Sequence, residues 1–161
     1  MKRILGLGVA FALLGMMAGC GSDSREGLIT ETINHIKLAS TEIGNIKTRV
    51  KEATDKATKE NKKLDLADAM EATKKLKETG EKTQDLKRRI DTVKATVSDE
   101  DRQSNAEKYR DDLNKAFASL LKQKEELREV LASAEKIDKT KVEDLRKKIV
   151  DAESPFEALS R

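Results

Sequence analysis

The chain has 161 residues, of which 33 are Lys or Arg and 30 are Asp or Glu, and its formal net charge is +3. Charges of both signs alternate without a basic block, so the sequence gives no indication of a nucleic-acid partner. Aromatic residues make up only 2% of the chain and Trp is absent, which is unlike the aromatic-rich core of a globular enzyme. A single domain rich in Ala, Glu, Lys, Leu and Arg favours long helices or a coiled coil.

The first twenty residues are organised like a secretory signal peptide. Lys2 and Arg3 give a positive start, and the uncharged run from Ile4 to Met17 is shorter than the ~20 apolar residues that a membrane-spanning helix needs. Small residues then lead to Cys20, the only cysteine of the chain. The order Met17-Ala18-Gly19-Cys20 resembles the lipobox of bacterial lipoproteins, with Met17 where Leu is commonest.

This resemblance implies cleavage behind Gly19 and lipid attachment to Cys20, the new N-terminus. Residues 1–19 are then the signal peptide, residues 20–24 a lipidated tether and residues 25–161 the helical-bundle domain. A thiolate is the best side-chain nucleophile for alkylation by a lipid donor, and about two acyl chains anchor a protein stably. The alternatives are a free thiol in a signal peptide that is cut off, or a cysteine that pairs with another chain.

The same resemblance implies a location in the cell envelope, on the extracytoplasmic or periplasmic side of a membrane. In enteric bacteria, an Asp directly after the lipidated cysteine retains a lipoprotein in the inner membrane. Gly21 stands at that position here, which favours the outer membrane. Cleavage also removes Lys2 and Arg3 and leaves 31 basic against 30 acidic residues.

Apolar residues recur every seven positions in three segments of the mature chain, as at the a and d positions of a coiled coil. The rows are Ile29, Ile36, Ile43, Val50, Ala57, Leu64 with Thr32, Ala39, Ile46, Ala53, Glu60; then Ala69, Leu76, Thr83, Ile90, Val97 with Ala72, Thr79, Leu86, Val93; then Ala106, Leu113, Leu120, Leu127, Ala134 with Tyr109, Ala116, Gln123, Val130, Ile137. The middle segment is offset in heptad phase from the other two. Turns between the segments explain this offset more simply than a stutter in one continuous helix.

The predicted helices span residues 25–60, 65–97, 100–137 and 140–153, each boundary being uncertain by ~2–4 residues. Together they predict an all-α fold, an elongated antiparallel helical bundle or coiled coil of about three long helices plus a short C-terminal helix. Ala and Thr at inward positions predict a thin core. Association with another copy would bury more of this surface.

Local signals mark the helix ends. Asn61 is a helix terminator and Asp65 an N-cap in the first connection, and Ser98 precedes acidic residues that suit a helix start. Thr140 and Glu143 match a capping box for the fourth helix.

Two further residues carry structural expectations. Pro155 disfavours helix at Ser154 and is predicted to end the fourth helix, although these residues could also open a last turn through Leu159. Gly80, in the interior of the second helix, predicts either a kink or the close approach of a neighbouring helix.

The chain offers few residues for chemistry. His35, the only histidine, lies one step off the apolar stripe, which predicts a plain exposed or boundary residue and not a metal ligand or base. Carboxylates such as Glu31 and Glu107 are typical of a solvated helix face, and the Glu-x-x-His pairs of di-iron bundles are missing. With Cys20 consumed by lipid, we expect no enzyme activity, no catalytic, cofactor-binding or metal residues and no small-molecule substrate.

Two classes of function remain. The first is a membrane-anchored helical lipoprotein with a structural or protein-interaction role, which meets a protein partner or forms a homo-oligomer through its helical faces. The second is a lipid- or unfolded-client-binding periplasmic protein of the chaperone type, with a superficial resemblance to apolipoproteins. The narrow apolar seam favours the first class. The chain ends in Ser160-Arg161, whereas the murein lipoprotein family ends in a Lys joined to peptidoglycan, so that linkage is not expected.

Overall fold

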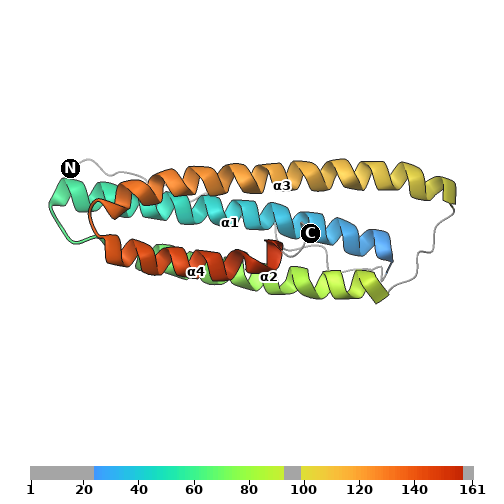
Figure 1. Ribbon diagram of the computed structural model, residues 1–161, viewed down its shortest axis with the longest axis horizontal. Helices are drawn as coiled ribbons and strands as arrows, with labels where there is room; N and C mark the ends of the chain where they lie inside the picture. Colours follow the sequence, from blue (N-terminus) through green and yellow to red (C-terminus); the bar gives the residue numbers. More distant parts are fainter. Residues whose placement is uncertain (1–23, 93–98, 158–161) are drawn as a thin grey trace, which may run out of the picture.

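The computed structural model of the protein describes residues 24–92 and 99–157, which form four helices (Figure 1). These are α1 (Arg25–Glu60), α2 (Ala67–Thr92), α3 (Asp99–Glu135) and α4 (Lys139–Glu157). They run along one long axis, with α1 and α3 pointing one way and α2 and α4 the other. The predicted all-α, elongated helical bundle is confirmed.

The four helices occupy the corners of a square. α1 packs against α2 and α3, and α4 packs closely against α2 and less closely against α3. Consecutive helices are antiparallel, but α1 and α3 are neighbours and therefore lie parallel. With a rise of about 1.5 Å per residue, α1 is about 54 Å long and α4 about 28 Å. Accordingly, α4 accompanies only the half of the bundle next to the α1–α2 connection (Figure 1).

Polar caps set the ends of the first two helices. Ser24 Oγ accepts a hydrogen bond from Gly27 N–H at 3.2 Å and caps α1. Asn61 ends α1 in the left-handed region, at φ 50° and ψ 42°, as predicted. Asp65 Oδ1 accepts a hydrogen bond from Ala67 N–H at 3.1 Å, so Asp65 caps the start of α2, also as predicted. The predicted helix end at residue 97 and the cap at Ser98 lie outside the described residues.

The heptad rows form the core. In α1, Ile36, Ile43, Ile46 and Val50 have no exposed surface, and Leu76 of α2 is equally buried. The rows of α3 are buried at Ala116, Leu120, Leu127 and Ala134. Row residues are exposed at Glu60, Ala106 and Ile137, and Ala53, Gln123 and Val130 are only partly buried.

The predicted capping box at Thr140 is wrong. The helix already begins at Lys139, so Thr140 lies inside α4. The cap is Asp138, whose Oδ1 accepts a hydrogen bond from Lys141 N–H at 3.1 Å. A carboxylate is at least as good an N-cap as a threonine hydroxyl, and here it comes two residues earlier in the chain.

The prediction that Pro155 ends the fourth helix is also wrong, because α4 continues to Glu157. Proline disfavours a helix because it lacks an N–H and its ring opposes the carbonyl one turn earlier. Here Pro155 and Phe156 are both buried against α2 at Gly80. Their burial outweighs the local preference for a helix end.

Of the two expectations for Gly80, close approach of a neighbouring helix is confirmed. A Cβ atom placed on Gly80 would lie 2.9 Å from Pro155 Cγ and 3.2 Å from Phe156 Cε2. These separations are shorter than ordinary carbon–carbon contacts, and both neighbours are rings that cannot fold away. The missing side chain at Gly80 therefore lets α4 lie directly on α2.

Gly80→Ala should lower the free energy of unfolding in spite of alanine's better helix propensity. Overpacking a close contact costs about 1–3 kcal/mol, against the roughly 1 kcal/mol gained by replacing a mid-helix glycine. Chemical denaturation followed by circular dichroism measures the difference. Gly44→Ala is the matched control, since its Cβ would meet the end of the Gln123 side chain at 3.3 Å, which is not a ring, and it should cost less stability than Gly80→Ala. A Gly80→Ala protein as stable as the Gly44→Ala protein would contradict the tight contact.

Candidate interaction surface

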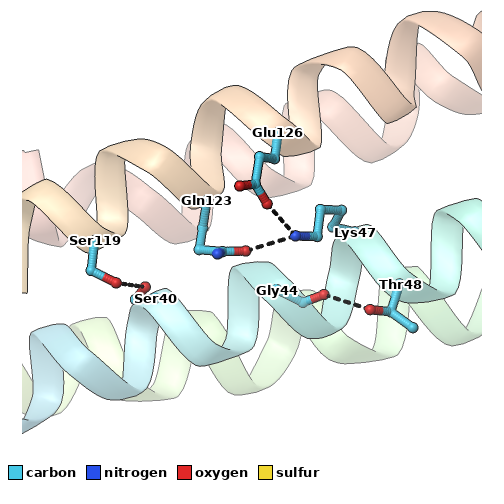
Figure 2. A network of polar contacts seen from close by, with 7 residues as sticks. All are labelled: Ser40, Gly44, Lys47, Thr48, Ser119, Gln123 and Glu126. Atoms are coloured by element: carbon cyan, nitrogen blue, oxygen red, sulfur yellow. Dashed lines mark hydrogen bonds and ion pairs between the residues drawn. The ribbon is translucent and has the colours of Figure 1, made fainter.

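A polar seam fixes α3 against α1 (Figure 2). Ser40 and Ser119 join their hydroxyl groups at 2.8 Å, and Lys47 Nζ donates to Gln123 Oε1 at 3.0 Å and to a carboxylate oxygen of Glu126. Ser40 and Ser119 are 79 residues apart, as are Lys47 and Glu126. A constant separation means that the two parallel helices stay in register along this seam, and α3 is thereby held at a fixed height on α1.

A second set of contacts fixes α4. Lys141 Nζ donates to the backbone oxygen of Leu64 at 2.5 Å and ties the start of α4 to the α1–α2 connection. At the other end of α4, Pro155 and Phe156 lie on Gly80. Both contacts draw α4 towards the side of α2, and α3 and α4 are the least closely packed pair of neighbouring helices.

The space between α3 and α4 is an apolar groove with two hollows. The first has a volume of about 220 Å³ and is lined mainly by Phe117, Leu120, Leu121 and Phe156. The second has a volume of about 490 Å³ and extends along Leu127, Leu131, Ile149 and Val150. Lys124, Glu153 and Glu157 line both hollows, which are therefore adjacent. We refer to the two together as the α3/α4 groove.

Two apolar side chains project into solvent beside this groove. Leu121 is 63% exposed and Val150 is 64% exposed, whereas the other exposed large hydrophobic residues of the described chain, Leu38 and Ile137, reach only about 40%. Single exposed leucines are ordinary on protein surfaces. Leu121 of α3 and Val150 of α4, however, both stand at the margin of one apolar groove, and exposed apolar residues gathered beside a groove can mark a binding surface.

An ion pair crosses the groove where its two hollows meet. Lys124 Nζ lies 2.8 Å from Glu153 Oε2 and 3.7 Å from Glu157 Oε1. Glu153 is only 8% exposed, and its burial raises the pKa of that carboxyl above the ordinary value, while Lys124 acts in the opposite direction. The rise means that the cost of removing the carboxylate from water exceeds the help from Lys124.

His35 lies at the boundary of the core, in agreement with the prediction. Its Nδ1 atom is buried and has no hydrogen-bond partner. Burial lowers the pKa of His35, an effect that Lys82 reinforces and Glu31 opposes. A neutral imidazole at this position is consistent with a packing role.

The residues predicted to carry the membrane anchor, Gly19 and Cys20, lie outside the described residues. Within 24–92 and 99–157 there is no group of three or more His, Cys, Asp and Glu side chains placed to hold a metal ion. The helices of the described chain contain no apolar stretch sufficient to cross a bilayer. Leu121 and Val150 were not among the residues predicted from the sequence. Each follows a core residue directly, so the trace that they leave in the sequence is an apolar residue just beside the heptad stripe.

Comparison with the models of known families, with curated proteins and with solved structures gives no match for this chain.

The raised pKa of Glu153 predicts a pH dependence of stability. Because the folded protein holds the proton more tightly than the unfolded chain, the favourable contribution of protonated Glu153 is complete below its ordinary pKa of 4.5 and is lost as the pH rises through the higher folded value. Glu153→Gln mimics the protonated carboxyl at every pH. We therefore expect Glu153→Gln to be at least as stable as wild type at pH 7, with wild type gaining relative to it as the pH falls towards 4.5.

Urea denaturation of both proteins across this range measures the difference, and the carboxylates common to both proteins cancel. A clear loss of stability in Glu153→Gln at pH 7 would show that the ion pair with Lys124 outweighs the burial cost.

Proposed function

We propose that this protein is a lipid-anchored helical lipoprotein of the cell envelope that acts by protein contact. The sequence pattern ending at Cys20 supports the anchor, and a tether of only a few residues separates that cysteine from the start of α1 at Arg25. The α3/α4 groove is the observation that carries the interaction role. It places apolar side chains on the side of a long bundle whose other faces are charged. A protein contact of this kind requires no cofactor, metal or small-molecule ligand.

The groove lies far from the proposed anchor. α1 and α3 begin at the same end of the bundle, and Phe117 and Leu131 mark the two ends of the groove on α3 (Figure 1). At about 1.5 Å per residue, the groove lies between about 27 and 48 Å from that end. A lipid on Cys20 would thus hold the binding surface well away from the lipid headgroups.

The shape of the groove suits an amphipathic helix. Leu127 of α3 and Ile149 of α4 form the buried floor of one hollow between the two antiparallel helices, with Val150 at its margin, and such a trough accepts apolar residues spaced by one helical turn. The flanking Leu121 and Val150 would be covered in the complex, and their burial would contribute roughly 1.5–3 kcal/mol each.

The lipid- or client-binding alternative rests on the hollow of about 220 Å³ between Phe117, Leu120, Leu121 and Phe156. Its wall is apolar and would take a short stretch of an acyl chain. The two functions can be told apart, because only the alternative requires the purified protein to bind a fluorescent fatty acid.

Cys20→Ser tests the anchor. The variant should incorporate no fatty-acid analogue and should leave the membrane fraction, because serine does not replace the thiolate as a lipid acceptor. Metabolic labelling and membrane fractionation measure both effects. Equal labelling of wild type and Cys20→Ser would contradict the proposal.

A deletion strain tests the role of tethering. A secreted form that lacks Cys20 should fail to restore function, whereas a form carrying an unrelated lipoprotein signal should restore it. Full rescue by the untethered form would favour the soluble, chaperone-type alternative.

A further inference from the structure

His35 lies on the edge of α1 that faces α2. Glu42, one heptad further along this edge, lines a hollow between the two helices. Arg49, two heptads along, comes within 3.9 Å of Asp68 of α2. Lys82 of α2 is close enough to His35 to affect its protonation. His35 is therefore a half-buried residue of the α1/α2 interface.

One nitrogen of the His35 ring suits only the neutral form. The Nδ1 atom is buried and makes no hydrogen bond with any described residue. A neutral imidazole tolerates this arrangement, because its single N–H can be carried by the other ring nitrogen, Nε2. A protonated imidazole has an N–H on both nitrogens, so it would bury a donor without an acceptor together with a positive charge.

The charges near the ring do not offset this cost. Among the described residues, Glu31 of α1 favours the charged ring and Lys82 of α2 disfavours it, and burial has a larger effect than either, so the pKa of His35 lies below its ordinary value of 6.5. The folded protein thus holds the proton less tightly than the unfolded chain. The stability that neutral His35 contributes is therefore complete above pH 6.5 and is lost as the pH falls through the lower folded value.

His35 is placed where the described bundle changes from four helices to three. Pro155 and Phe156 lie on Gly80, and α2 and α4 run in the same direction, so α4 ends close to the height of Lys82. Between this height and the start of α1, the described helices are α1, α2 and α3 alone (Figure 1). A region with fewer packed neighbours opens at a lower free energy than the rest of a protein. Protonation of His35 thus acts on the half of the bundle with the least support.

We propose that His35 is an acid-sensitive switch in the α1/α2 interface. When the ring takes up a proton, α1 and α2 separate in the half of the bundle next to the start of α1, and the half that contains α4 stays packed. His35 is the only histidine of the chain, so it is the only side chain whose ordinary pKa lies between about 5 and about 8. The switch involves neither the α3/α4 groove nor the anchor, so its tests do not depend on the proposed function.

Proton NMR of the purified protein tests the first step, since a single histidine gives an unambiguous ring signal. The ring of the folded protein should titrate below pH 6.5, and that of the urea-unfolded chain close to it. Lys82→Gln should raise the pKa in the folded protein, because a repulsive charge is removed. Lys75→Gln, one heptad away on α2, is the matched control and should leave the pKa unchanged. A folded ring that titrates at or above pH 6.5 would overturn the proposal.

The second test compares wild type with His35→Leu, which keeps an apolar side chain in the interface and cannot be protonated. As the pH falls from about 8 to about 5, the urea midpoint of wild type should fall relative to that of the variant, while the carboxylates common to both proteins cancel. His35→Gln takes the place of His35→Leu if the latter does not fold. A midpoint difference that stays constant over this range would show that His35 only packs, and the switch would be wrong.

Tyr109 reports which half of the bundle opens. It is the only tyrosine, Trp is absent, and its ring packs partly buried against the core. Paired positions of α1 and α3 are 79 residues apart, which places Tyr109 near the start of α1, at the height of Thr30. Acrylamide should therefore quench Tyr109 fluorescence more strongly at about pH 5 than at about pH 8 in wild type, but not in His35→Leu. Equal quenching of wild type at both pH values would contradict an opening in this half.

Hydrogen exchange then separates local from global opening. After correction for the intrinsic effect of pH on amide exchange, residues 28–40 of α1 should exchange faster at the lower pH, and the amides of α4 should not. Acceleration of α4 to the same degree would mean that the whole bundle loosens together, which would overturn the proposed switch.

Discussion

The close approach of α4 to α2 at Gly80 determines which surface the bundle leaves open. Without a side chain at that position, the rings of Pro155 and Phe156 reach the α2 backbone, and α4 is drawn to the α2 side of the square. The start of α4 is held to the same side by Lys141 on Leu64. α3 is fixed independently through its polar seam with α1, as Figure 2 shows. The two helices therefore take most of their contacts from different partners, apart from the ion pairs Lys124–Glu153 and Arg146–Glu135 that join them directly, and the groove lies between them.

The buried polar groups of this bundle contribute more to the placement of its helices than to its free energy of unfolding. The ion pair of Lys124 with Glu153 is buried enough for its desolvation cost to exceed its attraction, which is why the pKa of Glu153 rises. The pair nevertheless joins α3 to α4 across the groove, with Lys124 Nζ 2.8 Å from Glu153 Oε2, so it helps to position the two helices.

The heptad rows were enough to predict the fold class and the core. Ile, Val and Leu at a and d positions form one apolar stripe along each helix, and the stripes become buried when the helices pack against one another along them. They could not predict the parallel contact of α1 with α3. That contact depends on Ser40, Lys47 and Gln123, which lie partly off the apolar rows and pair across 76 to 79 residues. The predicted end of α4 was wrong for a related reason. The preference of Pro155 is a local property, and the tertiary contact with Gly80 overrides it.

The α3/α4 groove could not be predicted from the sequence, for the same physical reason. Leu121 and Val150 each stand next to a core residue, and a broad apolar stripe and an exposed patch give the same pattern along the chain. Only the spacing of α3 and α4 decides between them. Their exposed fractions of 63% and 64% become informative once the helices on either side are placed.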